Sequence, residues 1–278
     1  MNFVGNTTLS HAKPHKSTSY KVSNINLVFV DDKKEQNLTD TIIDEIDQTT
    51  KFVVVSYVQY STGSMIDIFR LRNTTNKFGS KLIVDVTQAA GALPINFDKW
   101  KCDALICSGY KWLGGHGGVG IAALSNEIIK SVPLTPGWMG AENPFYFNDK
   151  SFDLASDARR FTQSTMSYVS IKCLETSIRN LINIGIVNIK NHSVILKKLL
   201  INNLKGLNWE TYHNSINISS SPNIISLSNS FKNSGKIIQV LNENKIICSF
   251  RNEKLRVSLA HYNNENDIEK LIAILKNY

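Results

Sequence analysis

The sequence predicts an α/β protein: a mainly parallel sheet with flanking helices, followed by a small C-terminal α+β domain. Short apolar runs bounded by turn residues alternate with segments of helical periodicity over the first half of the chain. Two long helical segments then follow one another directly, and the last part mixes short strands with helices. At about 150 residues per domain, the 278 residues fit two domains, which we place at 1–185 and 186–278.

The alternating part of the chain supplies the expected sheet. Strands are expected over 25–31, 52–58, 81–86, 102–109 and 118–124, and helices over 38–46 and 66–79. The stretch 132–147 is rich in proline and aromatic residues, so we expect an irregular loop with a functional or interface role. In a sheet of this kind, ligands bind outside the carboxyl ends of the strands.

The remaining elements lie in the second half of the chain. Helices over 165–185 and 186–206 each end near a glycine, which helix C-termini favour. Short strands are then expected over 223–228, 245–250 and 255–259, with helices over 236–244 and 266–278.

Composition and charge exclude several classes of protein. The chain is 42% hydrophobic and 19% charged, as globular proteins are. Its 31 Lys and Arg against 23 Asp and Glu are scattered, so we expect no nucleic-acid partner. No apolar stretch reaches the ~20 residues of a membrane span or forms a signal peptide, so we expect a cytoplasmic protein without a membrane partner. The four cysteines lack metal-ligand spacing, and we expect neither a metal nor a disulfide framework.

The stretch SGYKWLGGHGG places Lys111 just beyond a predicted strand, and Asp85 ends the strand before it. Neighbouring parallel strands bring their carboxyl ends to one edge, so both side chains are expected to face one crevice. Taken alone, Asp85 could cap the turn that follows it, and Lys111 could be a solvated charge. Together, the amine can form a Schiff base with pyridoxal phosphate while the carboxylate keeps the pyridine nitrogen protonated.

Three more polar side chains border this crevice in the sequence. Ser108 and Tyr110 flank the lysine, and their hydroxyls could bind the phosphate of the cofactor. Gln88 follows the aspartate and could hydrogen-bond the phenolic oxygen of the ring. The sequence therefore supplies a group for each polar end of pyridoxal phosphate.

The glycines after the lysine need a separate test, because Gly115, Gly117 and Gly120 match the dinucleotide fingerprint GxGxxG. That fingerprint needs a helix after it, whereas the next residues, VGIAAL, are strand-like. A Rossmann nucleotide site is therefore excluded, and we expect a hairpin-like connection that returns the chain to the sheet.

Three stretches resemble the class V aminotransferases, the fold type I pyridoxal-phosphate family that includes cysteine desulfurases and kynureninase-like enzymes. They are VSYVQYSTGSMIDI, VDVTQAAGALPINFDKWKCDALICSGYKWLGG and LRVSLAHYNNENDIEKL. The resemblance runs from about Leu38 to the C-terminus and is most specific between Asp85 and Gly120. It implies that Lys111 forms the internal aldimine, that Asp85 pairs with the pyridine nitrogen and that Gln88 contacts the phenolic oxygen. It also implies that Ser108 and Tyr110 hold the phosphate. Relatives often have histidine at the position of Tyr110.

Two positions outside that block also match the family. Arg256 stands where the family arginine grips the substrate α-carboxylate, a task that suits a planar guanidinium with two parallel donors. Without the resemblance, the solvent face of an edge strand is the better interpretation of Arg256. Thr165 stands where relatives contact the phosphate of the neighbouring subunit, and relatives often have glycine where Ser164 stands. The resemblance therefore implies a homodimer.

The sequence also departs from the family pattern. Relatives begin with a further segment whose helix start binds the phosphate, so we expect the large domain to be N-terminally incomplete. No ring-stacking residue aligns, and His11 and His15 are candidates by residue type only. Desulfurases carry a nucleophilic cysteine on a mobile loop, whereas Cys248 lies in the apolar run IICSF, where we expect a buried, inert thiol.

The sequence thus predicts a pyridoxal-phosphate-dependent enzyme that acts at the α-carbon of an amino acid, by transamination or lyase chemistry, through an aldimine of Lys111. Two alternatives stay open. One is a lyase or hydrolase of the cysteine desulfurase or kynureninase-like type. The other is a non-catalytic, truncated subunit that needs a partner chain to complete its site.

Overall fold

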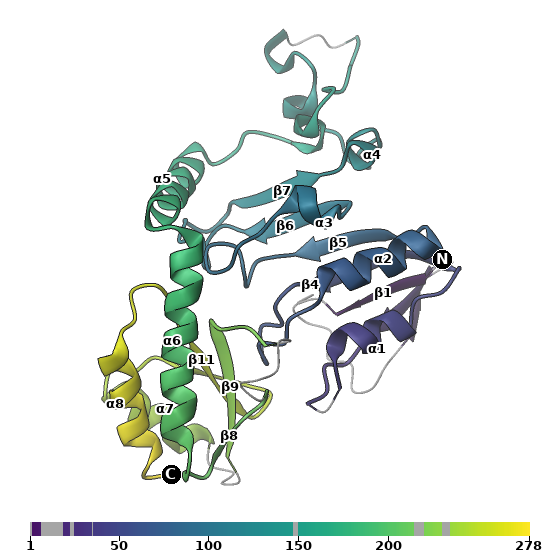
Figure 1. Ribbon diagram of the computed structural model, residues 1–278. Helices are drawn as coiled ribbons and strands as arrows, with labels where there is room; N and C mark the ends of the chain where they lie inside the picture. Colours follow the sequence, from purple (N-terminus) through teal and green to yellow (C-terminus); the bar gives the residue numbers. More distant parts are fainter. Residues whose placement is uncertain are drawn as a thin grey trace.

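The computed structural model describes residues 2–6, 19–22, 25–34, 36–146, 150–213, 220–229 and 234–278, which form two sheets with helices around them (Figure 1). The strands of the large sheet are β1 (Asn2–Asn6), β2 (Ser19–Val22), β3 (Ile25–Phe29), β4 (Thr50–Ser56), β5 (Lys81–Asp85), β6 (Ala104–Ser108) and β7 (Gly120–Leu124). They are arranged in the order β2-β3-β1-β4-β5-β6-β7.

The centre of the large sheet is parallel and its two edges are antiparallel. β1 pairs in parallel with β3 and β4, and the parallel pairing continues through β5 to β6. β2 and β7 run antiparallel to their neighbours at the two edges. The mainly parallel sheet expected from the sequence is therefore confirmed, and the carboxyl ends of β4, β5 and β6 lie along one edge.

The helices associated with the large sheet begin and end at residues that the sequence signals. In α2 (Ile68–Phe78), the Asp67 side chain accepts a hydrogen bond from Arg70 N, and Gly79 ends the helix in the left-handed conformation. The other helical segments in this part are α1 (Leu38–Asp44), α3 (Phe97–Trp100), α4 (Asn126–Ile129), η1 (Trp138–Gly140), η2 (Pro144–Tyr146), η3 (Ala158–Phe161) and α5 (Tyr168–Ile184).

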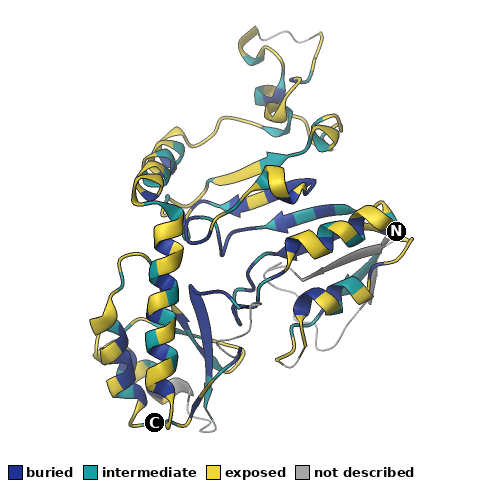
Figure 2. Cartoon of the chain, viewed as in Figure 1, coloured by how far each residue is buried: buried dark blue, intermediate teal, exposed yellow. Residues whose placement is uncertain are grey.

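The two faces of the large sheet are covered to different degrees (Figure 2). Along β5, Leu82 and Val84 are fully buried in the core. Asp85 lies on the opposite face and pairs in register with Ile106 of β6, whose side chain is 40% exposed. Along β6 and β7 this second face therefore keeps contact with solvent at the strand ends.

The second sheet is small and antiparallel. Its strands are β8 (Trp209–Thr211), β9 (Ile224–Asn229), β10 (Ser249–Arg251) and β11 (Lys254–Ser258), in the order β10-β11-β9-β8. The helices in this part are α6 (Ile186–Leu204), α7 (Ser234–Glu243) and α8 (Glu265–Leu275). Apolar side chains from α6, α8 and the sheet, including Leu200, Leu227 and Leu271, form a second hydrophobic core.

The two sheets touch where the loop after β4 meets the segment before β9. Gly63 O accepts a hydrogen bond from Ser221 N at 2.7 Å, and Ser64 forms a β-bridge with Ser220. Gly63 has φ +78°, and a Cβ at this position would lie 2.2 Å from Ile224 O, so only glycine fits. We call these contacts the seam. The division of the chain at Gly185, between α5 and α6, stays a prediction.

Most expected elements are present, with shorter bounds. The strand expected over 245–250 is reduced to β10, and residues 132–146 hold only the 3₁₀ turns η1 and η2 between irregular segments. The elements β1, β2, β8, α3 and α4 were not predicted, since none of them contains more than two consecutive apolar residues. Within the described residues, no helix is long and apolar enough to cross a membrane.

Candidate active site

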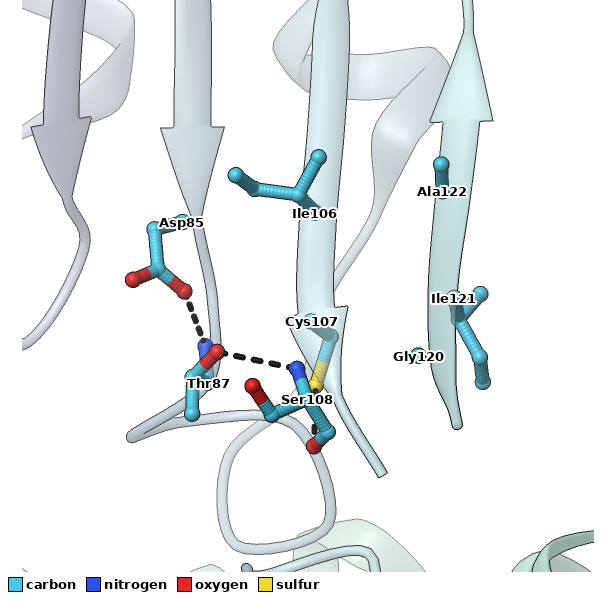
Figure 3. A pocket seen from close by; sticks show the side chains of 8 residues that line it. All are labelled: Asp85, Thr87, Ile106, Cys107, Ser108, Gly120, Ile121 and Ala122. Carbon is cyan, nitrogen blue, oxygen red and sulfur yellow. Dashed lines mark hydrogen bonds between the residues drawn. The ribbon is translucent and has the colours of Figure 1, made fainter. Parts of the chain in front are cut away.

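The strand ends bring the predicted acid and lysine to one edge of the large sheet. Asp85 ends β5 and Ser108 ends the neighbouring parallel strand β6, and Lys111 follows three residues later. β7 returns antiparallel from Gly120, which confirms the hairpin-like connection and excludes the helix that a dinucleotide site needs. Figure 3 shows Asp85 and Ser108 bordering one hollow at these strand ends.

A cavity of about 360 Å³ lies over these strand ends. Its lining residues come from β5, β6, β7 and the turn after β5, and they are Asp85, Thr87, Ile106, Cys107, Ser108, Gly120, Ile121 and Ala122 (Figure 3). The cavity therefore occupies the more exposed face of the sheet, with polar groups at the strand ends and aliphatic groups farther along the strands. Its volume is within the range of small-molecule sites.

Thr87 ties the two strand ends together. The Asp85 carboxylate accepts a hydrogen bond from Thr87 N at 2.8 Å, so the aspartate does stabilise the turn after its strand. The Thr87 hydroxyl in turn accepts from Ser108 N at 3.0 Å. These two bonds hold Asp85 and Ser108 on adjacent strands, and Figure 3 shows both. Sequence reasoning missed Thr87, although aspartate two residues before threonine is a common turn signal.

Lys111 lies among charges that act on its amine in opposite directions. Burial lowers the pKa of Lys111, the charge of Arg256 lowers it further, and the carboxylate of Asp85 raises it. Arg251 adds a smaller lowering contribution. Lys111 thus shares an electrostatic environment with Asp85 from the large sheet and Arg256 from the small sheet, so two of the predicted residues and the lysine come together.

Arg256 lies half-buried on β11, beside Ser226 of β9. Burial and the charge of Arg251 lower the pKa of its guanidinium. Arg256 Nε is buried and has no hydrogen-bond partner within the part of the chain that the structure describes. A buried guanidinium nitrogen without an acceptor is costly, and an anionic ligand would supply one.

Gln88 is buried, and its environment fixes the orientation of its amide. Trp112 Nε1, which can only donate, donates to Gln88 Oε1 at 3.1 Å. Gln88 O accepts from Asn223 Nδ2 at 3.1 Å, which links the residue to the small sheet. Trp112 is itself held closely, because a Cβ on Gly91 would lie 2.2 Å from Trp112 O. The amide nitrogen of Gln88 is therefore the end that faces away from the indole.

The remaining predicted residues lie at different distances from the cavity. Tyr110 is 55% exposed, and the centroid of the Tyr110 ring lies 5.8 Å from Lys111 Nζ. Thr165 is exposed in the segment between η3 and α5 and does not line the cavity. His11 and His15 lie outside the described residues.

Burial raises the pKa of three cysteines and so disfavours their thiolates. Cys102 belongs to the core of the large sheet, and the other two bear on the candidate chemistry. Cys107 lines the cavity, and burial raises its pKa to about 11. Burial also raises the pKa of Cys248, just before β10, to about 11. Both side chains are therefore neutral thiols near pH 7. Sequence reasoning did not single out Cys107 as a cavity residue, because its place in an apolar run is typical of the core.

Fold and site together define an α/β protein with a lysine and an acid at the carboxyl ends of parallel strands. A family model for class V aminotransferases matches residues 11–271. The chain belongs to the aminotransferase class-V family. Members of this family depend on pyridoxal phosphate. The resemblance inferred from the sequence is confirmed.

Curated relatives carry several different names. The chain is 26% identical over 230 residues to the uncharacterized aminotransferase YcbU of Bacillus subtilis, covering 82% of this chain and 59% of the relative. It is 27% identical over 248 residues to a probable cysteine desulfurase of Borreliella burgdorferi, covering 83% and 58%. It is 24% identical over 245 residues to a kynureninase of Bacillus mycoides, covering 85% and 56%. The chain thus spans somewhat more than half the length of these relatives.

Solved structures share the fold. A cysteine desulfurase from Thermococcus onnurineus superposes with a TM-score of 0.80 at 21% identity, covering 91% of this chain and 66% of the other. The cystine C-S lyase C-DES, in complex with its product cysteine persulfide, gives 0.80 at 19% identity, covering 91% and 69%. The fold type I architecture expected from the sequence is confirmed.

Proposed function

We propose that this chain binds pyridoxal phosphate at the ends of β5 and β6 and acts at the α-carbon of an amino acid. The observation that carries the proposal is the shared electrostatic environment of Lys111, Asp85 and Arg256, of which Asp85 lines the cavity. When bound, pyridoxal phosphate withdraws electrons from the α-carbon of an amino acid attached to it. The groups of the chain then need to hold the ring, orient the substrate and move one proton.

The residues present fit this cofactor in charge and in space. Lys111, Arg256 and Arg251 bring more positive than negative charge to the site, since Asp85 is the carboxylate that acts on Lys111. An excess of positive charge suits a phosphate together with a substrate carboxylate. The unpartnered Nε of Arg256 needs an acceptor, and the cavity over Asp85 leaves room for a small ligand.

Each residue has a role that follows from its position. Asp85, held by Thr87, would face the pyridine nitrogen, and Ser108 would donate to the phosphate together with Tyr110. The amide nitrogen of Gln88 would donate to the phenolic oxygen, because Trp112 occupies its carbonyl oxygen. Arg256 would hold the α-carboxylate of the substrate in a bidentate contact.

Lys111 would hold the cofactor and, once the substrate amine has replaced it, carry the α-proton. Burial and Arg256 lower the pKa of Lys111, so its amine is neutral at a lower pH than that of an ordinary lysine. A neutral amine can accept the α-proton at Nζ. Transamination and elimination share this step, and no group described above separates them.

Covalent capture tests the assignment of the lysine. The chain is incubated with pyridoxal phosphate, reduced with borohydride, digested and mapped by mass spectrometry. We expect a pyridoxyl group on Lys111, and its loss in Lys111→Ala. Lys205, exposed at the end of α6, is the matched control, and Lys205→Ala should label normally. Labelling spread evenly over exposed lysines would contradict the proposal.

The state of Cys248 favours reactions without a persulfide. A desulfurase needs a thiolate nucleophile, whereas burial raises the pKa of Cys248 to about 11. Cys248→Ser should therefore leave the turnover of amino acids unchanged. Loss of sulfide release from cysteine in this variant would instead support the desulfurase alternative.

A homodimer is favoured by the apolar side chains exposed on residues 132–169. Val132, Leu134, Phe145 and Tyr146 are each at least 70% exposed, and Leu134 reaches 99%. Patches of this kind mark interaction sites, and Thr165 lies in the same region. Sedimentation should give twice the mass of one chain, and Leu134→Asp with Phe145→Asp should give single chains. A cytoplasmic location stays a prediction of the sequence.

The alternative of a subunit completed by a partner chain is favoured by the incomplete cover of the sheet. Ile106 keeps solvent contact directly beside Asp85, and Ala122 keeps it on the next strand, opposite Ile106. If a partner supplies this cover, the isolated chain should show no labelling of Lys111, and labelling should appear on adding cell extract. Labelling of the pure chain would reject this alternative.

A further inference from the structure

A second cavity lies between α6 and the loops of the large sheet, away from the strand ends that carry Lys111. Its volume is about 330 Å³, and none of its residues lines the first cavity. One wall is helix α6, which extends from α5 along the small sheet in Figure 1. The lining residues are Tyr57, Met65, Leu93, Pro94, Lys190, Val194, Lys197, Lys198, Ile201, Ser220 and Pro222.

The α6 wall carries both charge and apolar surface on one helix face. Lys190, Val194, Lys197, Lys198 and Ile201 are three or four residues apart or adjacent, a spacing that places them on one side of the helix. The opposite wall is formed by residues after β4, after β5 and before β9, and it is mostly apolar, with hydroxyls only on Tyr57 and Ser220. A molecule in this cavity would contact aliphatic side chains along its length and ammonium groups at its edge.

The three lysines bring positive charge without a carboxylate partner. Lys190, Lys197 and Lys198 form no ion pair within the described part of the chain. Lys197 Nζ donates to Ser220 Oγ at 2.8 Å and to Ser221 O at 3.0 Å, two neutral oxygens. Burial lowers the pKa of Lys197 to about 8, which shows that its charge lacks compensation.

We propose that this cavity is a binding site for a small amphipathic carboxylate, with the carboxylate on Lys197 and the aliphatic or aromatic body against Leu93 and Ile201. The ammonium has a third proton to donate, and a carboxylate would both accept it and offset the buried charge. Lys190 and Lys198, both exposed, would add long-range attraction. The proposal does not depend on the function proposed for Lys111.

Calorimetric titration of the full chain with octanoate tests the site. We expect one saturable site, with octan-1-ol, acetate and inorganic phosphate each at least about tenfold weaker, because each lacks one half of the recognition. Lys197→Met should weaken octanoate by about tenfold or more. Lys197→Arg, which keeps the positive charge, should bind octanoate with nearly the same affinity as the unaltered chain.

Matched variants separate this site from other causes. Lys205→Met removes an exposed charge beyond the cavity and should leave the affinity unchanged. Arg256→Gln should also leave it unchanged, and a loss there would place octanoate beside Lys111 and Arg256 and overturn the proposal. If Lys197→Met unfolds, the exposed pair Lys190→Met with Lys198→Met decides, and it should weaken octanoate severalfold. Equal binding of octanoate and octan-1-ol, or of octanoate and phosphate, would also overturn the proposal.

Discussion

Lys111 owes its chemistry to the balance of charges around one amine. Arg256 lowers its pKa and Asp85 raises it, and these residues come from different sheets. Neither influence follows from the sequence around the lysine itself. Arg256, the charge that acts most strongly on Lys111, lies 145 positions after it in the chain. The reactivity of this lysine therefore depends on how the small sheet is placed.

Neutralising either neighbour should shift the pKa of Lys111 in opposite directions. Arg256→Gln removes a positive charge and should raise the pKa, whereas Asp85→Asn removes a negative charge and should lower it. Reductive methylation with formaldehyde at several pH values, read by mass spectrometry, measures the pKa without the cofactor. The midpoint for Lys205 should not move. Shifts of the same sign in both variants would contradict this electrostatic account.

At the residue scale, the sequence predicted the position of those site residues that a local pattern marks. Asp85 and Ser108 end predicted parallel strands, so their meeting at one edge was predictable from topology alone. The roles of Gln88 and Tyr110 came from their polar groups and from the family resemblance, that of Arg256 came from the resemblance alone, and all three stay predictions. Trp112 and the bond from Ser108 to Thr87 were missed because each contact joins residues more than 20 positions apart, whereas the bond of Thr87 to Asp85 is local and its turn signal was overlooked.

At the scale of elements, the core strands depend on one buried carboxylate. Asp103, just before β6, is 4% exposed and pairs with Arg72 of α2 at 2.7 Å and with Lys81 of β5 at 3.3 Å. It also accepts from Leu82 N at 2.9 Å. The carboxylate thus joins a helix and a strand to the start of β6, at the end of the sheet opposite the candidate site.

Asp103→Ala should lower the free energy of unfolding by about 3–5 kcal/mol, because it leaves two cations without their buried partner. Urea denaturation measures this change. Asp157→Ala is the control, since Asp157 pairs with Arg159 on the surface and should contribute far less to stability than Asp103. A similar cost for the two variants would show that the Asp103 network is not structural.

Elements that show a helical period or an apolar run were predictable, and elements that show neither were not. α5 and α6 show several turns of helical period, and β4 and β5 are apolar runs between turn residues. β10 is shorter than expected, because the apolar residues before it, including Ile246 and Cys248, pack on the small core without joining the sheet. Their hydrophobicity predicts that these residues are buried, but it does not predict whether their backbone groups form hydrogen bonds in the sheet.

At the scale of the whole molecule, a buried polar cluster joins the two parts of the chain. Ser64 Oγ donates to Asp32 Oδ2 at 2.6 Å and lies 2.5 Å from His213 Nε2. Burial, together with the charge of Lys197, lowers the pKa of His213 to about 4. Burial raises the pKa of Asp32. Both ionisable groups are thus held nearer their neutral forms.

The His213 pKa predicts a loss of stability in acid. Between pH 6.5 and about 4, the unfolded chain binds a proton at this histidine more readily than the folded chain does. The free energy of unfolding should therefore fall as the pH falls through this window, by at most about 3 kcal/mol. Asp32 acts with the opposite sign, because its raised pKa makes the folded chain bind protons more readily.

Comparing variants isolates the contribution of the histidine. Urea denaturation at pH 7 and pH 4.5 should show a smaller loss of stability for His213→Gln than for the unaltered chain. His261→Gln, at an exposed position, should behave like the unaltered chain. An equal loss in all three proteins would assign the acid sensitivity to other groups.

The seam limits how the small sheet can rotate relative to the large sheet. Any rotation that opened the chain at Gly63 would break the hydrogen bond from Ser221, and any rotation that closed it would press the Ile224 carbonyl into the glycine. A rotation of the small sheet that kept both contacts would therefore turn about these residues. Arg256, on β11, would then move along an arc around these residues. The distance between its guanidinium and Lys111 would therefore depend on the angle of rotation and not on a translation of the small sheet.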